Sequence, residues 1–81
     1  MDSAHRSIRA KLSTMSPRRA ADYIHALGLP ADEEACVIGV DVHGLSCVQV
    51  ASSLHLSVDG FYKMRRRAYR KIVDAERGST P

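Results

Sequence analysis

The sequence has few aromatic residues and no long apolar stretch. Its 81 residues include four aromatics and no tryptophan, which is too few for a platform on which single-stranded nucleic acid stacks its bases. No apolar run approaches the roughly 18 residues that a membrane-spanning helix needs. A chain of this length forms at most one domain and is too short for a deep catalytic cleft. The aromatic residues are Tyr23, Phe61, Tyr62 and Tyr69.

The sequence also lacks the patterns of metal sites and catalytic centres. Cys36 and Cys47 fall within apolar periodic segments and are fewer than a secreted mini-protein usually carries, so we expect reduced thiols in a cytoplasmic protein. The histidines and cysteines show none of the close spacings of metal ligands. Ser46 with His43 has no aspartate placed to complete a triad, and a helix N-cap explains the serine. We therefore expect no enzyme activity, no metal and no cofactor.

Positive charge is missing from the middle of the chain. Residues 28–57 contain no lysine or arginine and carry four carboxylates. Residues 1–27 have five basic and two acidic side chains, and residues 58–81 have seven basic and three acidic ones. The net charge of +3 therefore hides an acidic segment between two basic ones. Such polarity bears on the partners of a protein rather than on its fold.

Apolar spacing predicts five helices and no strand. Apolar residues recur at intervals of three and four, and no segment alternates with period two. We expect an all-α fold, a compact bundle of four to five helices that ends in a helix-turn-helix with a long second helix. The helices are expected near residues 4–14, 16–28, 30–44, 46–55 and 57–76.

Capping residues mark the boundaries of these helices. Ser16 and Pro17 suit the start of the second helix, and Ser46 with Gln49 has the spacing of a capping box at the start of the fourth. Ser57 suits the N-cap of the fifth. Glycines suited to left-handed C-caps are Gly28 and Gly44. Negative charge that the dipole of the third helix favours comes from Asp32, Glu33 and Glu34.

Residues 45–72 carry the pattern of a helix-turn-helix, in which two helices cross at a sharp angle over a short turn. The small Ala51 suits the closest approach of the two helices. His55 suits the left-handed residue of the turn, because histidine tolerates positive φ better than most residues. Apolar side chains expected to fill the angle are Val50, Leu54, Leu56, Phe61 and Met64.

The outward face of the last predicted helix is basic, as in a helix that enters the major groove of DNA. Residues near the start of such a helix meet base edges and later ones meet phosphates. Candidates for base contact are Asp59, Tyr62 and Lys63. Candidates for phosphate contact are Arg66, Arg67 and Arg70. The competing interpretation is that the run Arg65-Arg66-Arg67 is an ordinary solvated helix face.

Residues 29–72 resemble the fourth conserved region of bacterial sigma factors, which reads the upstream promoter element. The matching segments are residues 29–33 (LPADE against L-P-x-x-E), 41–46 (DVHGLS against E-G-L-S), 54–57 (LHLS against L-G-I-S) and 68–72 (AYRKI against R-A-x-x-K-L). The resemblance implies DNA binding in transcription. It places Ser46 and Gln49 near phosphate, with Ser57 in the same candidate set. It assigns DNA contact to Val58, Asp59, Tyr62, Lys63 and Arg67, although Val58 and Gly60 replace residues that are often polar or basic in the family.

These observations predict three segments and leave two functions open. We expect a helical extension over residues 1–28, a sigma-like domain over 29–76 and a disordered tail over 77–81. The preferred function is sequence-specific binding of double-stranded DNA by a transcriptional regulator, of the stand-alone kind found in prophages and mobile elements. The alternative is a module that docks on the RNA polymerase core or another partner; a DNA-gripping subunit of phage packaging is a third reading.

The first two predicted helices have two possible uses. They either pack across the motif and lengthen its core, or form a homodimer through Ile8, Leu12 and Met15.

Overall fold

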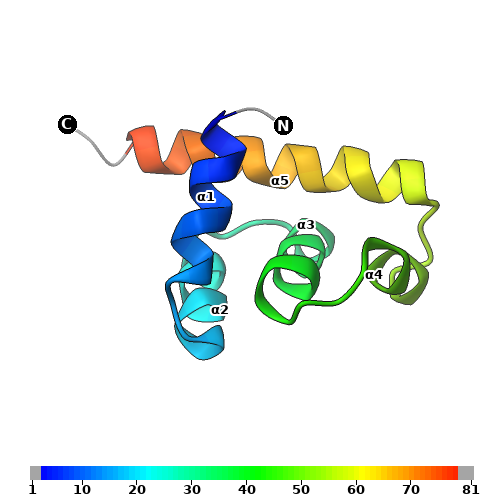
Figure 1. Ribbon diagram of the computed structural model, residues 1–81. Coiled ribbons are helices and arrows are strands. Elements are labelled where there is room, and N and C mark those ends of the chain that lie inside the picture. Colours follow the sequence, from blue (N-terminus) through cyan, green and yellow to red (C-terminus); the bar gives the residue numbers. More distant parts are fainter. Residues whose placement is uncertain (1–2, 79–81) are drawn as a thin grey trace.

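The computed structural model describes the backbone of residues 3–78 and the side chains of residues 6–76. Over this range the fold is entirely helical, as the sequence predicts. Five α-helices and one π-helical segment, η1, follow one another without a strand (Figure 1). Their bounds are α1 Ser3–Ser13, α2 Pro17–Ala26, α3 Ala31–Val37, η1 Ile38–Val42, α4 Cys47–Ser53 and α5 Val58–Gly78.

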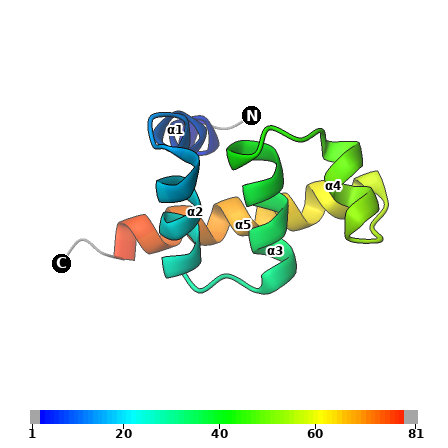
Figure 2. The same ribbon diagram turned by 90° about the horizontal axis from the view of Figure 1, so that it is seen from below.

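The long helix α5 is the central element of the fold, against which other helices pack. The helices α2, α3 and α4 lie along one side of it, and α1 crosses it near its C-terminal half (Figures 1 and 2). α3, α4 and α1 each pack directly against α5. One long flank of α5 is therefore left uncovered by the other helices over its N-terminal half (Figure 1).

The predicted caps are present. Arg19 N donates to Ser16 Oγ across 3.3 Å at the start of α2, with Pro17 at the first helical position. Ser46 and Gln49 form both hydrogen bonds of the capping box, 2.9 and 3.1 Å long. Both cap glycines adopt a φ of +70°. An N-cap serine contributes about 1 kcal/mol to stability. The sequence therefore defines these helix boundaries by local chemistry.

The third predicted helix differs from expectation because it widens after Val37. Residues 38–42 form one π-helical turn, closed by a hydrogen bond of 2.9 Å from His43 N to Ile38 O. Gly39 lies inside this turn, where a Cβ atom would meet Val50 Cγ2 of α4 at 2.7 Å. The glycine therefore allows the turn to approach α4 closely. The periodicity of the sequence could not predict this close approach, because the contact joins two segments that are separate in the sequence.

Two apolar clusters form the core. One joins α1, α2, α3 and the C-terminal half of α5, and includes Ile8, Leu12, Ile24 and Ile72. The other lies inside the helix-turn-helix, between α3, α4 and the start of α5. Ile8 and Leu12 are each 2 % exposed, so α1 and α2 extend the core of their own chain. The expected homodimer through Ile8, Leu12 and Met15 has no support in this fold, because Ile8 and Leu12 are buried within the monomer.

The C-terminal boundary also differs slightly from the prediction. α5 continues to Gly78, two residues beyond the expected end of the domain at residue 76. The rest of the expected tail, residues 79–81, lies outside the described residues, as do Met1 and Asp2 of the expected N-terminal extension. Within the described range, no helix is both long and apolar enough to cross a membrane.

We predict that Gly39→Ala lowers the free energy of unfolding by about 1–3 kcal/mol, the usual cost of overpacking. This cost exceeds the gain of at most about 1 kcal/mol that alanine has over glycine in a helix. Urea denaturation of the purified variant measures the change. In a Val50→Ala background the same substitution should cost clearly less, because the clashing Cγ2 is gone. Equal costs in both backgrounds would contradict the close approach.

Candidate nucleic-acid interface

The turn between α4 and α5 has the predicted geometry. His55 adopts a φ of +58°. Its N–H donates to Ser52 O across 3.1 Å and the N–H of Leu56 donates to Ala51 O across 2.8 Å. These are the two hydrogen bonds of a Schellman motif, which ends a helix and turns the chain sharply. The apolar residues expected to fill the angle form one cluster with Cys36 and Ala51, and Ser57 Oγ caps α5 by accepting from Gly60 N at 3.0 Å.

Between Asp59 and Asp74, α5 carries six cationic side chains and no carboxylate. Two of the six, Arg65 and Lys71, form ion pairs with carboxylates of other elements. The remaining four point outward. We call these four residues the basic face: Lys63, Arg66, Arg67 and Arg70.

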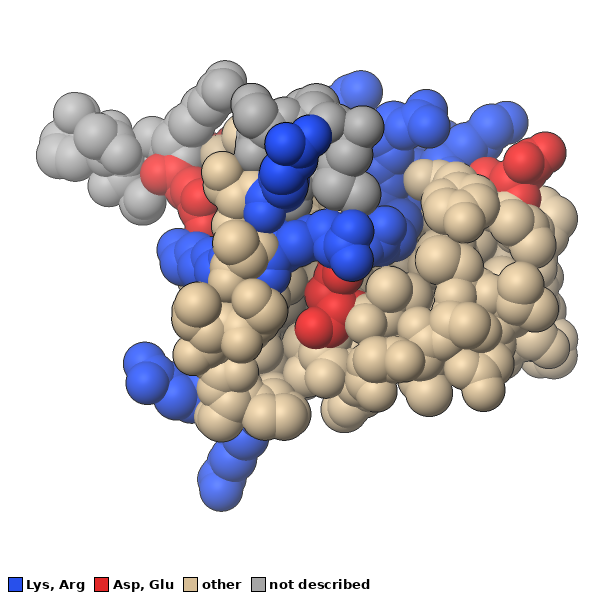
Figure 3. Space-filling view, viewed as in Figure 1, with Lys and Arg blue, Asp and Glu red and all other residues tan. Residues whose placement is uncertain are grey.

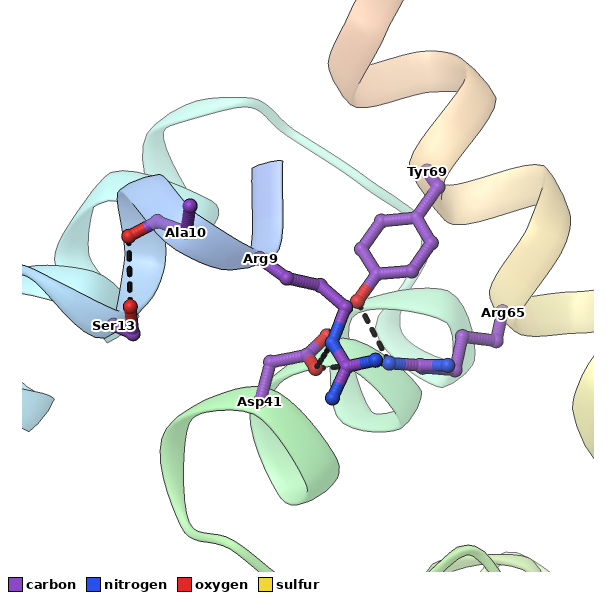
Figure 4. Close-up of polar contacts among 6 residues, drawn as sticks. All are labelled: Arg9, Ala10, Ser13, Asp41, Arg65 and Tyr69. Carbon is purple, nitrogen blue, oxygen red and sulfur yellow. Dashed lines mark hydrogen bonds and ion pairs between the residues drawn. The ribbon is translucent and has the colours of Figure 1, made fainter. Parts of the chain in front are cut away.

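Arg65 lies in a cluster around the carboxylate of Asp41, which sits in the π-helical turn (Figure 4). Arg65 Nη2 donates to Asp41 Oδ1 across 2.8 Å and to the Tyr69 hydroxyl across 2.7 Å. The Tyr69 hydroxyl donates to the other carboxylate oxygen. Arg9 of α1 approaches the same carboxylate at 3.6 Å. The cluster of Arg9, Asp41, Arg65 and Tyr69, named here the Asp41 cluster, therefore joins α1, η1 and α5.

The Asp41 cluster is buried except for Arg9, whose side chain is 50 % exposed. The side chain of Asp41 is 4 % exposed and that of Arg65 is 11 % exposed. Burial, together with the hydrogen bond to the carboxylate, raises the pKa of Tyr69 far above its usual value, so the hydroxyl stays a donor. The guanidinium of Arg65 also stacks over the Tyr69 ring at 4.8 Å. The contacts hold α5 in one rotation about its axis, in which the basic face points away from the core.

The sequence analysis missed the role of Asp41. Its signal was present: Asp41 is the only carboxylate between Glu34 and Asp59, and Arg65 and Tyr69 flank the predicted apolar stripe with a spacing of four. A charged side chain on a buried surface needs a partner of opposite charge, and Asp41 is the acid available in the segment that packs there.

Glu33 also has a role beyond compensating the helix dipole. It is 8 % exposed, and its Oε2 accepts from Lys71 Nζ across 2.9 Å. This ion pair fastens α3 to α5 and removes Lys71 from the set of unneutralised cations. The next residue of α3, Glu34, pairs with His25 of α2.

A further polar contact holds the C-terminal end of α5 to α1 and α2. Glu76 accepts from Lys11 Nζ at 2.9 Å and from the Tyr23 hydroxyl at 2.6 Å. These hydrogen bonds lower the pKa of Glu76 and raise that of Lys11, so both groups are charged at neutral pH. α5 is thus fixed at its middle by Asp41 and near its end by this triad.

The basic face is exposed and lines an open depression along α5. No ion pair to a carboxylate within residues 6–76 neutralises any of its four side chains. Lysine and arginine side chains gather along the upper edge of the molecule over the N-terminal half of α5, whereas the face over α4 carries none (Figure 3). The arrangement presents donors for phosphate oxygens on one side of one helix.

The other predicted site residues lie at the starts of α4 and α5. The polar ones, Ser46, Gln49 and Ser57, are exposed but serve as caps; the capping box uses the side-chain oxygen of Gln49 and does not require its amide nitrogen. Asp59 is exposed in the first turn of α5. Val58 and Tyr62 are exposed as well. The structure therefore brings the ten predicted residues to the surface of one motif, and it buries Arg65, which was not among them.

The two cysteines have free thiols and different surroundings. Cys36 is fully buried, and burial together with the negative charge of Asp32 raises its pKa to about 11. Cys47 is half-buried at the start of α4, and its thiol raises the pKa of the Tyr62 hydroxyl. Among the described residues, no three His, Cys, Asp or Glu side chains are placed to hold a metal ion.

Comparison with protein-family models, curated proteins and solved structures found no match to this chain.

We predict that Asp41→Ala lowers the free energy of unfolding by about 3–5 kcal/mol, because it leaves the buried guanidinium of Arg65 without its counter-charge. Thermal and urea unfolding measure the loss. Asp22→Ala, which removes an exposed carboxylate from α2, is the matched control and should change stability by less than about 0.5 kcal/mol. Similar losses in the two variants would contradict the central place of Asp41.

We also predict that a water-soluble disulfide reagent at pH 8 modifies Cys47 in the folded protein and reaches Cys36 only on unfolding. The thiolate is the reactive form, and Cys36 is buried with a pKa raised to about 11. The release of the coloured thiol product gives the two rates, and Cys47→Ser should abolish the fast phase. A single common rate for both thiols would refute this assignment.

Proposed function

We propose that this protein binds double-stranded DNA sequence-specifically and regulates transcription, with α5 in the major groove. The observation that carries the proposal is the basic face: four exposed cations that no carboxylate within residues 6–76 neutralises and that the Asp41 cluster turns away from the core. A major groove is wide enough for one helix. Cations along such a helix neutralise phosphates, and this electrostatic contribution supplies much of the affinity of DNA-binding proteins.

The helix-turn-helix geometry supports the same proposal. In the first turn of α5, Val58 and Asp59 are exposed and would meet base edges, while Arg66, Arg67 and Arg70 lie further along the helix, where phosphates flank the groove. Ser46 and Gln49 at the start of α4 would contact the backbone of the duplex. The resemblance of residues 29–72 to the promoter-reading region of sigma factors favours a role in transcription, in the cytoplasm of a bacterium, beside RNA polymerase.

A second candidate function is docking on RNA polymerase or another protein with little DNA binding. The observation that favours it is the uncharged surface over α4, where Leu45 is 44 % and Val48 is 63 % exposed. Exposed apolar residues of this kind often mark protein interfaces. The two functions can be distinguished by whether the protein binds duplex DNA in a manner that depends on salt and on the basic face.

We expect the protein to bind duplex DNA at low salt, with log K falling against log salt at a slope of about −4 if the four cations of the basic face each neutralise one phosphate. Arg66→Ala with Arg67→Ala should weaken binding to every duplex and reduce the magnitude of the slope by about 2. Fluorescence anisotropy of a labelled duplex at several salt concentrations measures both quantities.

The matched control is Arg18→Ala with Arg19→Ala. It removes the same charge from exposed residues at the start of α2. In Figure 1 this start lies at the end of the molecule that is far from α5. This variant should bind nearly as the wild type does. Absence of duplex binding at low salt would favour the docking function, and equal losses in the two double variants would argue against α5 as the DNA-contacting helix.

A further inference from the structure

The large hydrophobic side chains that are exposed within residues 6–76 are confined to the helix-turn-helix. They are Leu45, Val48, Val58 and Tyr62. Two of them flank the start of α4 and two belong to the first two turns of α5. Elsewhere the described helices bury their large apolar residues wholly or in part, so the grouping marks a surface that the fold itself leaves uncovered.

Val58 and Tyr62 form an apolar pair at the entrance of α5. Val58 is the first residue of the helix and is 43 % exposed, and Tyr62 is 45 % exposed one turn later. Residues four apart lie on the same side of a helix. The Tyr62 ring makes an edge-to-face contact with the fully buried ring of Phe61, with centroids 5.7 Å apart. The pair therefore forms an apolar edge that lies directly beside the core of the helix-turn-helix.

Apart from the carboxylate of Asp59, the start of α5 lacks the side chains that most often read bases by hydrogen bonds. Residues 58–62 include no arginine, lysine, asparagine or glutamine, and Gly60 offers no side chain. The one apolar group that base pairs present in the major groove is the C5 methyl of thymine. We propose that Val58 and Tyr62 contact thymine methyl groups and make the protein select thymine at those positions of its target.

A base edge is favoured over a protein as the occupant by the charge beside the pair. Lys63 follows Tyr62 directly, and the rest of the basic face continues along the same helix. An approach that brings phosphates to Arg66 and Arg67 also brings the start of α5 into the groove. Because this inference rests on the proposed function, its test must separate failure to bind DNA from failure to read methyl groups.

The experiment replaces thymine by uracil. A duplex is selected from a random pool with the full-length protein and remade with deoxyuridine at one thymine position at a time, which removes only the methyl group. At positions that face the pair, each replacement should weaken binding about three- to fivefold, the value of one buried methyl. Val58→Ala should bind the thymine and uracil duplexes equally at one such position, and Tyr62→Ala at another.

The control is Arg70→Ala, which should weaken binding to both duplexes alike and leave their ratio unchanged. Circular dichroism confirms that each variant is folded. Salt-dependent binding without any thymine-to-uracil effect would overturn the inference alone and leave the pair to a protein partner. A thymine preference that survives both apolar variants would overturn the assignment to these residues. Absence of duplex binding would overturn the proposed function and the inference together.

Discussion

The buried carboxylate of Asp41 is the constraint on which the rest of the arrangement depends. A single acid meets a guanidinium and a tyrosine hydroxyl from α5 and a second guanidinium from α1. Desolvating these groups is costly, and only good geometry with satisfied hydrogen bonds offsets that cost. The polar contacts thus admit few alternatives, whereas an apolar surface tolerates sliding and rotation. The orientation of α5, and with it the direction of every outward side chain, follows from this specificity.

The acidic middle of the chain divides the cations of α5 into two sets. Asp41 and Glu33 both come from residues 28–57, where the chain has no lysine or arginine. They neutralise Arg65, which is buried, and Lys71, whose side chain is 48 % exposed, and leave the other four unpaired within the described residues. A modest net charge of +3 is therefore compatible with a strongly positive strip, because the opposing charges are separated in space. Potential at a surface depends on this separation more than on the total.

Local chemistry made much of the fold predictable. Serine caps, cap glycines, the left-handed His55 and the apolar spacing of three and four depend on residues close in sequence. The set of residues on the outward face of α5 also follows from helical geometry once α5 is placed, whereas the resemblance alone adds Ser46, Gln49 and Val58 as candidates for DNA contact. What could not be predicted joins distant segments. The partner of Arg65 lies 24 residues away, and a glycine is needed at position 39 only because Val50 packs against it. Neither contact produces a periodic pattern in the sequence.

The π-helical turn has a consequence for the length of the chain. Its hydrogen bond spans five residues rather than the four of an α-turn, so the segment contains one residue more than a regular helix would need. A relative shorter by a single position here would close an ordinary helix. Because each residue advances a helix by about 100°, the side chain of Asp41 would then point away from Arg65. Insertions and deletions are thus least tolerable where the backbone is most irregular.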